Sequence, residues 1–234
     1  GYDALSYHLQ LPKEWIAAGG VTTFQHNVYS AFPSAVEAAF MHLFLLAGGD
    51  ERGAIAAQCL ASLVTLLTAA GVGVLARRVT GSPGAWLAAT LYLATPWNLV
   101  VGTLAYNDGF VNLFLAVGLL LVTREPRTAW QSGGALGLLL GAACSAKLTA
   151  VGFAVAPLVA VLALRRRGAA IAPLAIAGAV ALVTLLPWLV RNALATGNPT
   201  FPFLTGLFGF GWWTPEQAAI FRDAHSAAGG AAGG

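Results

Sequence analysis

The sequence predicts an all-α protein, a polytopic bundle of transmembrane helices. Hydrophobic residues make up 58% of the 234 residues and charged residues only 9%, and the mean hydropathy is +0.74. Soluble domains carry roughly 25% charged residues, so this composition argues against a water-soluble fold. Apolar runs of helical length, separated by short charged boundaries, indicate the same fold class.

The positions of the arginines predict how these helices are threaded. Small groups of arginine stand at every second boundary between apolar runs, as in the cytoplasmic loops of multi-span proteins. These clusters are Arg77 with Arg78, Arg124 with Arg127, and Arg165 to Arg167. They hold more than half of the basic residues, so membrane orientation explains the net charge of +3 and no nucleic-acid partner is expected.

Residues 1–34 are expected to form an extracytoplasmic loop with short helices outside the hydrocarbon layer, because aromatic and polar side chains alternate there. The next run, 32–47, has helical periodicity but only about 16 residues, short of the roughly 20 that a span needs. It also carries Glu37 and His42. We therefore expect an amphipathic helix lying along the membrane.

About six transmembrane helices are expected to share residues 35–200 with this amphipathic helix. They are 54–76, 85–104, 110–123, 133–146, 148–164 and 169–190. The apolar block 133–164 is about 32 residues long with Lys147 near its middle, so two spans that turn at Lys147 fit it better than one tilted span. Residues 201–234 are expected to form an extracytoplasmic aromatic loop and a flexible Gly/Ala tail.

The boundaries opposite the arginine clusters carry isolated polar groups. Asp108, Lys147 and the pair Arg191 and Asn192 fall on this side, together with Asp3. A membrane face that gathers acid, base and amide groups is a candidate active site. Carboxylates beside cations suit a reaction in which an acid group deprotonates a hydroxyl while positive charge stabilises a departing phosphate, as in glycosyl transfer from a lipid phosphate.

Each of these residues also has a purely structural interpretation. Asp3 and Asp108 both precede a predicted helix, where aspartate is a favoured N-cap. Lys147 would then only extend toward water, and Arg191 would anchor the end of a span at the interface.

The remaining polar and aromatic residues carry weaker signals. His8 and His26 are candidates to join Asp3 in a divalent-cation site, although their spacing matches no compact ligand motif. Cys59 and Cys144 lie in apolar runs and are expected to pack as small hydrophobic residues. Six aromatic residues are expected to form an interfacial belt or to line a lipid-tail groove. They are Phe201, Phe203, Phe208, Phe210, Trp212 and Trp213.

Several segments together carry a family resemblance. In order they read YDALSYHLQLPKEWIAAGG with FPSAVEAAF downstream, then LARRVTG, LAYNDGF, GAACSAKLTA and LPWLVRNALATGNPTFPF. Their order and spacing, over nearly the whole chain, resemble the GT-C membrane glycosyltransferases, in particular the group related to protein O-mannosyltransferases and the lipid A aminoarabinose transferase. The pair Asp3 and Ala4 departs from the Asp-Glu pair of the eukaryotic mannosyltransferases.

The resemblance implies a GT-C-like helical core whose first span would precede Gly1. It implies a catalytic aspartate in the first extracytoplasmic loop, carried onto Asp3, and a second acidic residue carried onto Asp108. Lys147 and Arg191 resemble basic residues of the family that are suited to contact phosphate. The residues expected to bind substrate are Tyr7, His8, Lys147, Arg191 and Asn192.

The expected activity is inverting transfer of a sugar from a polyprenyl-phosphate donor to a hydroxyl of a lipid, glycan or protein acceptor. The site would face the outside of a bacterial inner membrane, with a divalent cation as an optional cofactor. Without the family's first and carboxy-terminal spans, this segment is not expected to be active alone. The alternatives are a transporter or lipid flippase, and a membrane subunit that only binds lipid.

Overall fold

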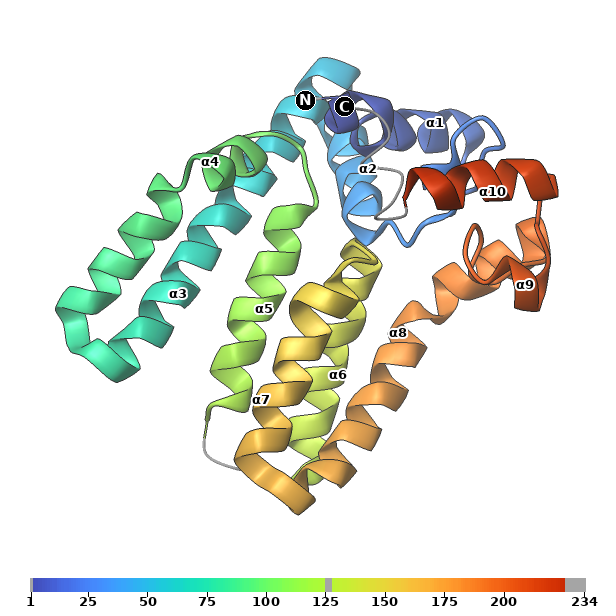
Figure 1. The fold of residues 1–234 in the computed structure, drawn as a ribbon. Helices are drawn as coiled ribbons and strands as arrows, with labels where there is room; N and C mark the ends of the chain where they lie inside the picture. Colours follow the sequence, from blue (N-terminus) through green and yellow to red (C-terminus); the bar gives the residue numbers. More distant parts are fainter. Residues whose placement is uncertain (1, 125–127, 226–234) are drawn as a thin grey trace. The chain divides into compact units, whose positions relative to one another are not determined.

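The computed structural model describes residues 2–124 and 128–225, and every regular element in those ranges is a helix (Figure 1). The predicted all-α class is therefore confirmed. The chain divides into two compact units. Unit 1 comprises Gly1–Val21 and Pro33–Leu185, and unit 2 comprises Thr22–Phe32 and Leu186–Gly234. Arg127 and the predicted Gly/Ala tail from Ala227 onward lie outside the described residues.

Unit 1 is built of helices joined by short connections. In chain order they are η1 (Ala4–His8), α1 (Gln10–Ala18), α2 (Ala35–Ala47), α3 (Asp50–Ala94), α4 (Pro96–Thr103), α5 (Asp108–Val122), α6 (Ala129–Ala146), η3 (Val151–Val155), α7 (Ala156–Arg166), η4 (Arg167–Ala170) and the first part of α8 (Ile171–Thr196). η1 and η3 are single turns of π-helix, and η4 is a single 3₁₀ turn.

The predicted short amphipathic helix corresponds to α2. Its buried face includes Glu37, Phe40 and Phe44, while Leu45 and Leu46 are exposed on the other side. This spacing places the buried residues on one stripe of the helix. A carboxylate on the buried stripe of a helix is unusual. Glu37 has specific hydrogen-bond partners, which are described below.

The longest helical segment, α3, consists of two arms joined at Gly81. Gly81 has φ 74° and ψ −168°, a left-handed conformation that breaks the helix without a Cβ penalty, and the chain reverses direction there (Figure 1). The two arms correspond to the predicted spans 54–76 and 85–104. The second arm ends earlier than expected, at Ala94, because the chain bends at Thr95 and a new helix, α4, starts at Pro96.

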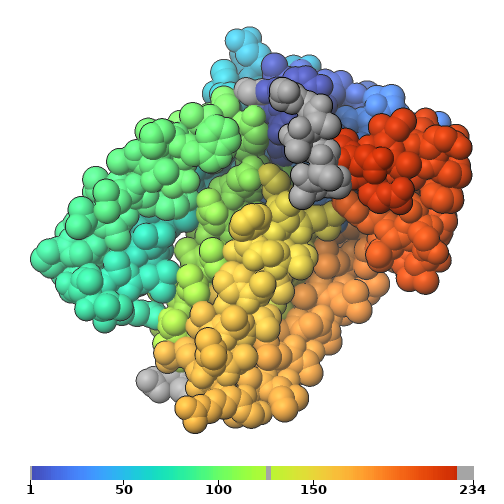
Figure 2. Space-filling model, viewed as in Figure 1, coloured from blue at the N-terminus to red at the C-terminus, as the bar shows by residue number. Residues whose placement is uncertain are grey.

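Leucines form the core between α5, α6 and α7. Leu136 and Leu140 of α6 and Leu158 and Leu162 of α7 are at most 4% exposed. Elsewhere in unit 1, the surface is hollowed where α3 meets α5, as the space-filling view shows (Figure 2). This hollow of about 280 Å³ is lined mainly by apolar side chains.

Glycines four residues apart bring α6 against α8. At Gly133, Gly137 and Gly141, an added Cβ would lie 2.6 Å from an atom of α8. Gly134, on another side of α6, has nothing within 4 Å of the same position. Small residues at four-residue spacing let two backbones approach closely, which is typical of helix pairs in membranes.

By length and hydropathy, two helical segments within the described ranges are able to cross a membrane, Asp50–Ala94 and Val151–Thr196. A third is counted if α4 and α5, bent by 113° at a short break, form one span. The two long segments each contain a reversal, at Gly81 and near Arg167 (φ 47°) (Figure 1). Each therefore holds two of the six predicted apolar runs, and the count of six spans stays a prediction.

Unit 2 contains η2 (Val28–Ala31), the end of α8, α9 (Thr205–Phe208) and α10 (Pro215–Ala224). Phe201 is 1% exposed, and its ring lies 5.4 Å from that of Trp212 and 5.0 Å from that of Trp213. It therefore belongs to the core of unit 2 and not to the expected interfacial belt. Phe203, Phe208 and Phe210 are exposed, and their place in an interfacial belt stays a prediction.

Candidate functional site

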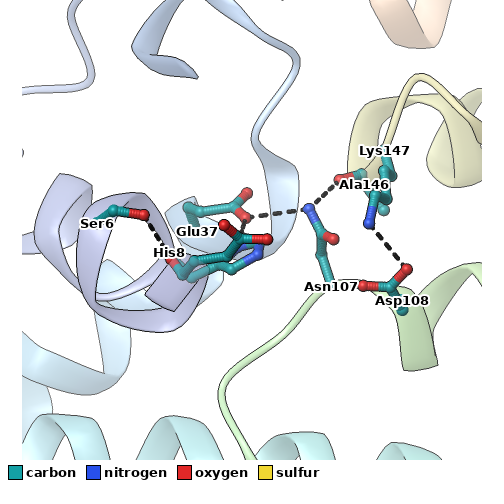
Figure 3. A network of polar contacts seen from close by, with 8 residues as sticks. Ser6, His8, Glu37, Asn107, Asp108, Ala146 and Lys147 are labelled. Atoms are coloured by element: carbon teal, nitrogen blue, oxygen red, sulfur yellow. Dashed lines mark hydrogen bonds and ion pairs between the residues drawn. The ribbon is translucent and has the colours of Figure 1, made fainter. Parts of the chain in front are cut away.

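Asp108 and Lys147 form an ion pair in unit 1. Asp108 is the first residue of α5 and Lys147 directly follows α6, and Lys147 Nζ lies 2.8 Å from Asp108 Oδ1 (Figure 3). The side chains are 29% and 40% exposed for Lys147 and Asp108, so a ligand is able to reach both. The chain turns at Lys147, as predicted, because the residue leaves α6 in an extended conformation.

Asp3 is exposed at the start of η1. It occupies the N-cap position but makes no side-chain capping bond. The N-cap of α5 is Asn107, and Asp108 itself is the first helical residue. The capping interpretation of the two aspartates therefore finds no support: Asp3 makes no capping bond, and Asp108 is paired with Lys147.

Tyr106, in the connection between α4 and α5, relates Asp108 to the helix turn that carries Asp3. The pKa of its phenol is raised by desolvation first, and then by the negative charges of Asp3 and Asp108. The rings of His8 and Tyr106 lie 5.3 Å apart, which places η1, whose N-cap is Asp3, next to the segment that leads into Asp108. The structure thus brings the two predicted catalytic residues to the same part of unit 1.

A buried polar network lies beside this pair (Figure 3). His8 Nδ1 is hydrogen-bonded to Glu37 Oε1 at 2.5 Å, and the side chains are 0% and 2% exposed. Asn107 Nδ2 donates to the same Glu37 oxygen at 3.2 Å and to the carbonyl of Ala146 at 2.9 Å. Elements far apart in sequence therefore meet at one carboxylate.

Four atoms around this network are buried and have no hydrogen-bond partner within the described residues. They are His8 Nε2, Glu37 Oε2, Asn107 Oδ1 and Ser145 Oγ. Leaving buried polar atoms unpaired costs about 1–3 kcal/mol each, which makes a purely stabilising role a poor explanation for this cluster. Aromatic rings enclose it, since His8 lies 4.0 Å from the ring of Tyr7 and 5.3 Å from that of Tyr106.

The predicted substrate-binding residues on η1 differ in access. Tyr7 is half-buried, whereas His8 is inaccessible and faces Glu37. His8, His26 and Asp3 do not form the predicted cation site, because within residues 2–124 and 128–225 no three His, Cys, Asp or Glu side chains are placed to hold a metal ion. Cys144 is buried and Cys59 exposed, both as free thiols.

In unit 2, Arg191 and Asn192 fasten α8 to the segment Thr22–Phe32. Arg191 Nη2 donates to the Phe32 carbonyl at 3.1 Å, and Asn192 Nδ2 donates to the Ala31 carbonyl at 2.5 Å. The guanidinium also lies 5.0 Å from the centre of the Trp188 ring, a cation–π geometry. Its buried Nη1 has no partner among the described residues.

The arginine clusters of unit 1 lie at the helix ends opposite the Asp108–Lys147 pair. Arg78 donates to Thr123, at the end of α5 distant from Asp108, at 2.6 Å. Arg166 donates to Ser132, near the start of α6 and distant from Lys147, at 3.1 Å. Since α5 has 15 residues, roughly 22 Å separate its two ends. Within unit 1 this arrangement agrees with the predicted threading.

Sequence reasoning did not assign a role in the site to Glu37 or Asn107. The available signal was a single carboxylate inside the apolar run FPSAVEAAF, which was read only as part of an amphipathic helix. Asn107 stands next to Asp108, and only Asp108 was considered as a candidate. Their role depends on contacts across 29 and 70 residues of sequence, which no local pattern reveals.

A family model described as Domain of unknown function (DUF8201) matches residues 107–230, more than half of the chain. The matched region begins at Asn107 and includes Asp108, Lys147 and Arg191. No curated protein and no solved structure matches the chain.

Proposed function

We propose that this chain, which belongs to the DUF8201 family, is part of an integral membrane glycosyltransferase. It would move a sugar from a polyprenyl phosphate to a hydroxyl of a lipid, glycan or protein acceptor, with inversion at the anomeric carbon. The membrane setting is supported by two helical segments apolar enough to cross a bilayer and by exposed aliphatic side chains along them, such as Leu66, Leu91 and Leu182.

The observation that carries the proposal is the partly exposed ion pair of Asp108 and Lys147, which lies in the same part of unit 1 as η1 and its exposed Asp3. The reaction needs a base for the acceptor hydroxyl and positive charge for the departing phosphate. Asp3 supplies an exposed carboxylate, and Lys147 supplies a partly exposed ammonium held by Asp108 at 2.8 Å. These groups lie on three different elements, so only the fold brings them together.

The proposed step moves one proton and exchanges one bond. Asp3 accepts the proton of the acceptor hydroxyl as its oxygen attacks the anomeric carbon. The bond between that carbon and the phosphate oxygen breaks, and polyprenyl phosphate leaves with the electron pair. Lys147 stabilises the developing phosphate charge, and Asp108 holds Lys147 in place.

Within unit 2, Arg191 is proposed as a contact for an anionic group, supported by its own geometry. Asn192 and the Phe32 carbonyl hold its guanidinium, which leaves Nη1 without a partner among the described residues. A planar guanidinium fixed in this way is well suited to bind a phosphate oxygen. Tyr7, half-buried in unit 1, is proposed to assist substrate binding. Asn192 is 3% exposed and its amide is bonded to Arg191 and to the Ala31 carbonyl, so within unit 2 it is proposed to hold Arg191 in place.

The test is a transfer assay on the full-length protein in membranes, with radiolabelled polyprenyl-phosphate hexoses as donors. Asp3→Asn should lower kcat by about 100-fold or more, because a general base typically contributes 10²–10⁴-fold. Asp50→Asn is the matched control, since Asp50 is an exposed carboxylate paired with Lys13. Transfer should be measured with and without a chelator to define the role of a divalent cation.

Unchanged turnover in the Asp3→Asn protein would remove Asp3 from the mechanism. Movement of intact labelled donor across the bilayer without transfer would support a transporter or flippase. Donor binding with neither transfer nor movement would support a lipid-binding subunit.

A further inference from the structure

Hydrogen bonds link the buried Glu37 to residues near the three charged groups of the proposed site. Asp3, Asp108 and Lys147 lie at the start of η1, the start of α5 and the end of α6. A residue of the buried network lies on the same element as each of them or next to it in sequence. His8 is the last residue of η1, whose N-cap is Asp3, while Asn107 precedes Asp108 and Ala146 precedes Lys147.

The hydrogen bonds of the network join these neighbours in a chain. Glu37 Oε1 lies 2.5 Å from His8 Nδ1 and accepts from Asn107 Nδ2 at 3.2 Å. Asn107 uses its second N–H for the Ala146 carbonyl at 2.9 Å. The amide nitrogen of Asn107 carries two N–H donors, which matches two partners that are both acceptors, a carboxylate and a carbonyl.

Burial separates this role from direct catalysis. Glu37 and His8 are at most 2% exposed, so neither side chain reaches a substrate in this conformation. Yet an isolated carboxylate is costly to bury unless its hydrogen bonds are satisfied, and Glu37 has two of them on a single oxygen. The network therefore holds η1, α5 and α6 to α2 at the level of the site (Figure 3).

We propose that Glu37, acting through His8 and Asn107, is the positioning residue of the site. It sets the spacing of Asp108 and Lys147 and orients the turn that carries Asp3. This inference rests on the proposed function for its consequence in transfer, but its geometric content is independent of it. Loss of Glu37 separates the charged groups, and a displacement of about 1 Å can cost 100-fold in rate.

The first arm of the test measures spacing without relying on activity. Cysteines replace Asp108 and Lys147 in a Cys59→Ala, Cys144→Ala background, and a short bifunctional thiol reagent is added to the full-length protein in membranes. Because these substitutions remove the ion pair, the cross-linking rate reports how firmly the network holds α5 and α6. Glu37→Ala and Asn107→Ala should slow cross-linking several-fold.

Conservative and control variants separate positioning from general destabilisation. Glu37→Gln keeps an oxygen that accepts from Asn107 and should retain most of the cross-linking rate. His42→Ala, an exposed position on the same helix α2, should leave the rate unchanged. If Glu37→Ala does not reach the membrane, Asn107→Ala still tests the link, because it spares the bond between His8 and Glu37.

The second arm measures transfer in proteins that keep Asp108 and Lys147. Glu37→Ala and Asn107→Ala should lower kcat by about 100-fold, with substantial recovery in Glu37→Gln. Native cross-linking rates in both alanine variants would overturn the inference, as would slower cross-linking with normal transfer. Absence of transfer in the unsubstituted protein, with cross-linking altered as expected, would instead contradict the proposed function.

Discussion

At the scale of single residues, the two carboxylates of the site differ in their surroundings. Asp108 is engaged by Lys147 at 2.8 Å, whereas Asp3 is exposed at the start of η1. A general base must be free to accept a proton, and an ammonium held by a carboxylate is suited to meet a phosphate. In the proposed mechanism, this difference is the reason for giving proton transfer to Asp3 and stabilisation of the leaving group to Lys147.

Tyr106 offers a direct test of this arrangement. Its pKa is raised by desolvation and by the charges of Asp3 and Asp108, so neutralising Asp3 removes one of the raising effects. In Asp3→Asn, the pKa of Tyr106 should therefore fall toward the ordinary tyrosine value. The measurement is the absorbance of ionised tyrosine against pH, with Tyr106→Phe in each background to isolate this residue. An identical Tyr106 transition in both backgrounds would place Asp3 outside its surroundings.

At the scale of elements, sequence patterns predicted what depends on local periodicity. Run length and apolar spacing were sufficient for α2 and for helix within each of the six apolar runs, and the central lysine predicted the turn at Lys147. Close packing of α6 on α8 was not predicted, because it depends on which face of α6 the glycines share in the folded chain. The core position of Phe201 was also not predicted, because its burial depends on tertiary contacts that no local pattern shows.

The packing of α6 on α8 makes a prediction for stability. Gly137→Ala should destabilise the protein by about 1–3 kcal/mol, because the new methyl group would overpack against the Ala177 carbonyl at 2.6 Å. Gly134→Ala is the matched control on the same helix, where nothing lies within 4 Å, and should be neutral or slightly stabilising. Thermal unfolding in detergent measures both. Equal stability of the two variants would mean that α6 and α8 do not approach so closely.

At the scale of the whole molecule, the membrane sidedness drawn from the arginine clusters stays a prediction. In unit 1 they lie at the helix ends away from Asp108 and Lys147, as the threading required. The burial of the Glu37 carboxylate was not predicted, because its hydrogen-bond partners come from distant segments of the sequence. Arg191 and Asn192 belong to unit 2, where they also hold the Thr22–Phe32 segment, a role that the sequence did not show.

The most direct test of the proposed site is a map of its sidedness by labelling single cysteines in a Cys59→Ala, Cys144→Ala background. Cysteine at the exposed positions Tyr2 and Thr149 reports the Asp3 and Lys147 side, and cysteine at Thr80 and Thr128 reports the arginine side. With the full-length protein in intact cells, a membrane-impermeant maleimide should label Tyr2→Cys and Thr149→Cys, and should reach Thr80→Cys and Thr128→Cys only after permeabilisation. Labelling of Tyr2→Cys and Thr149→Cys from opposite sides of the membrane would contradict a single site.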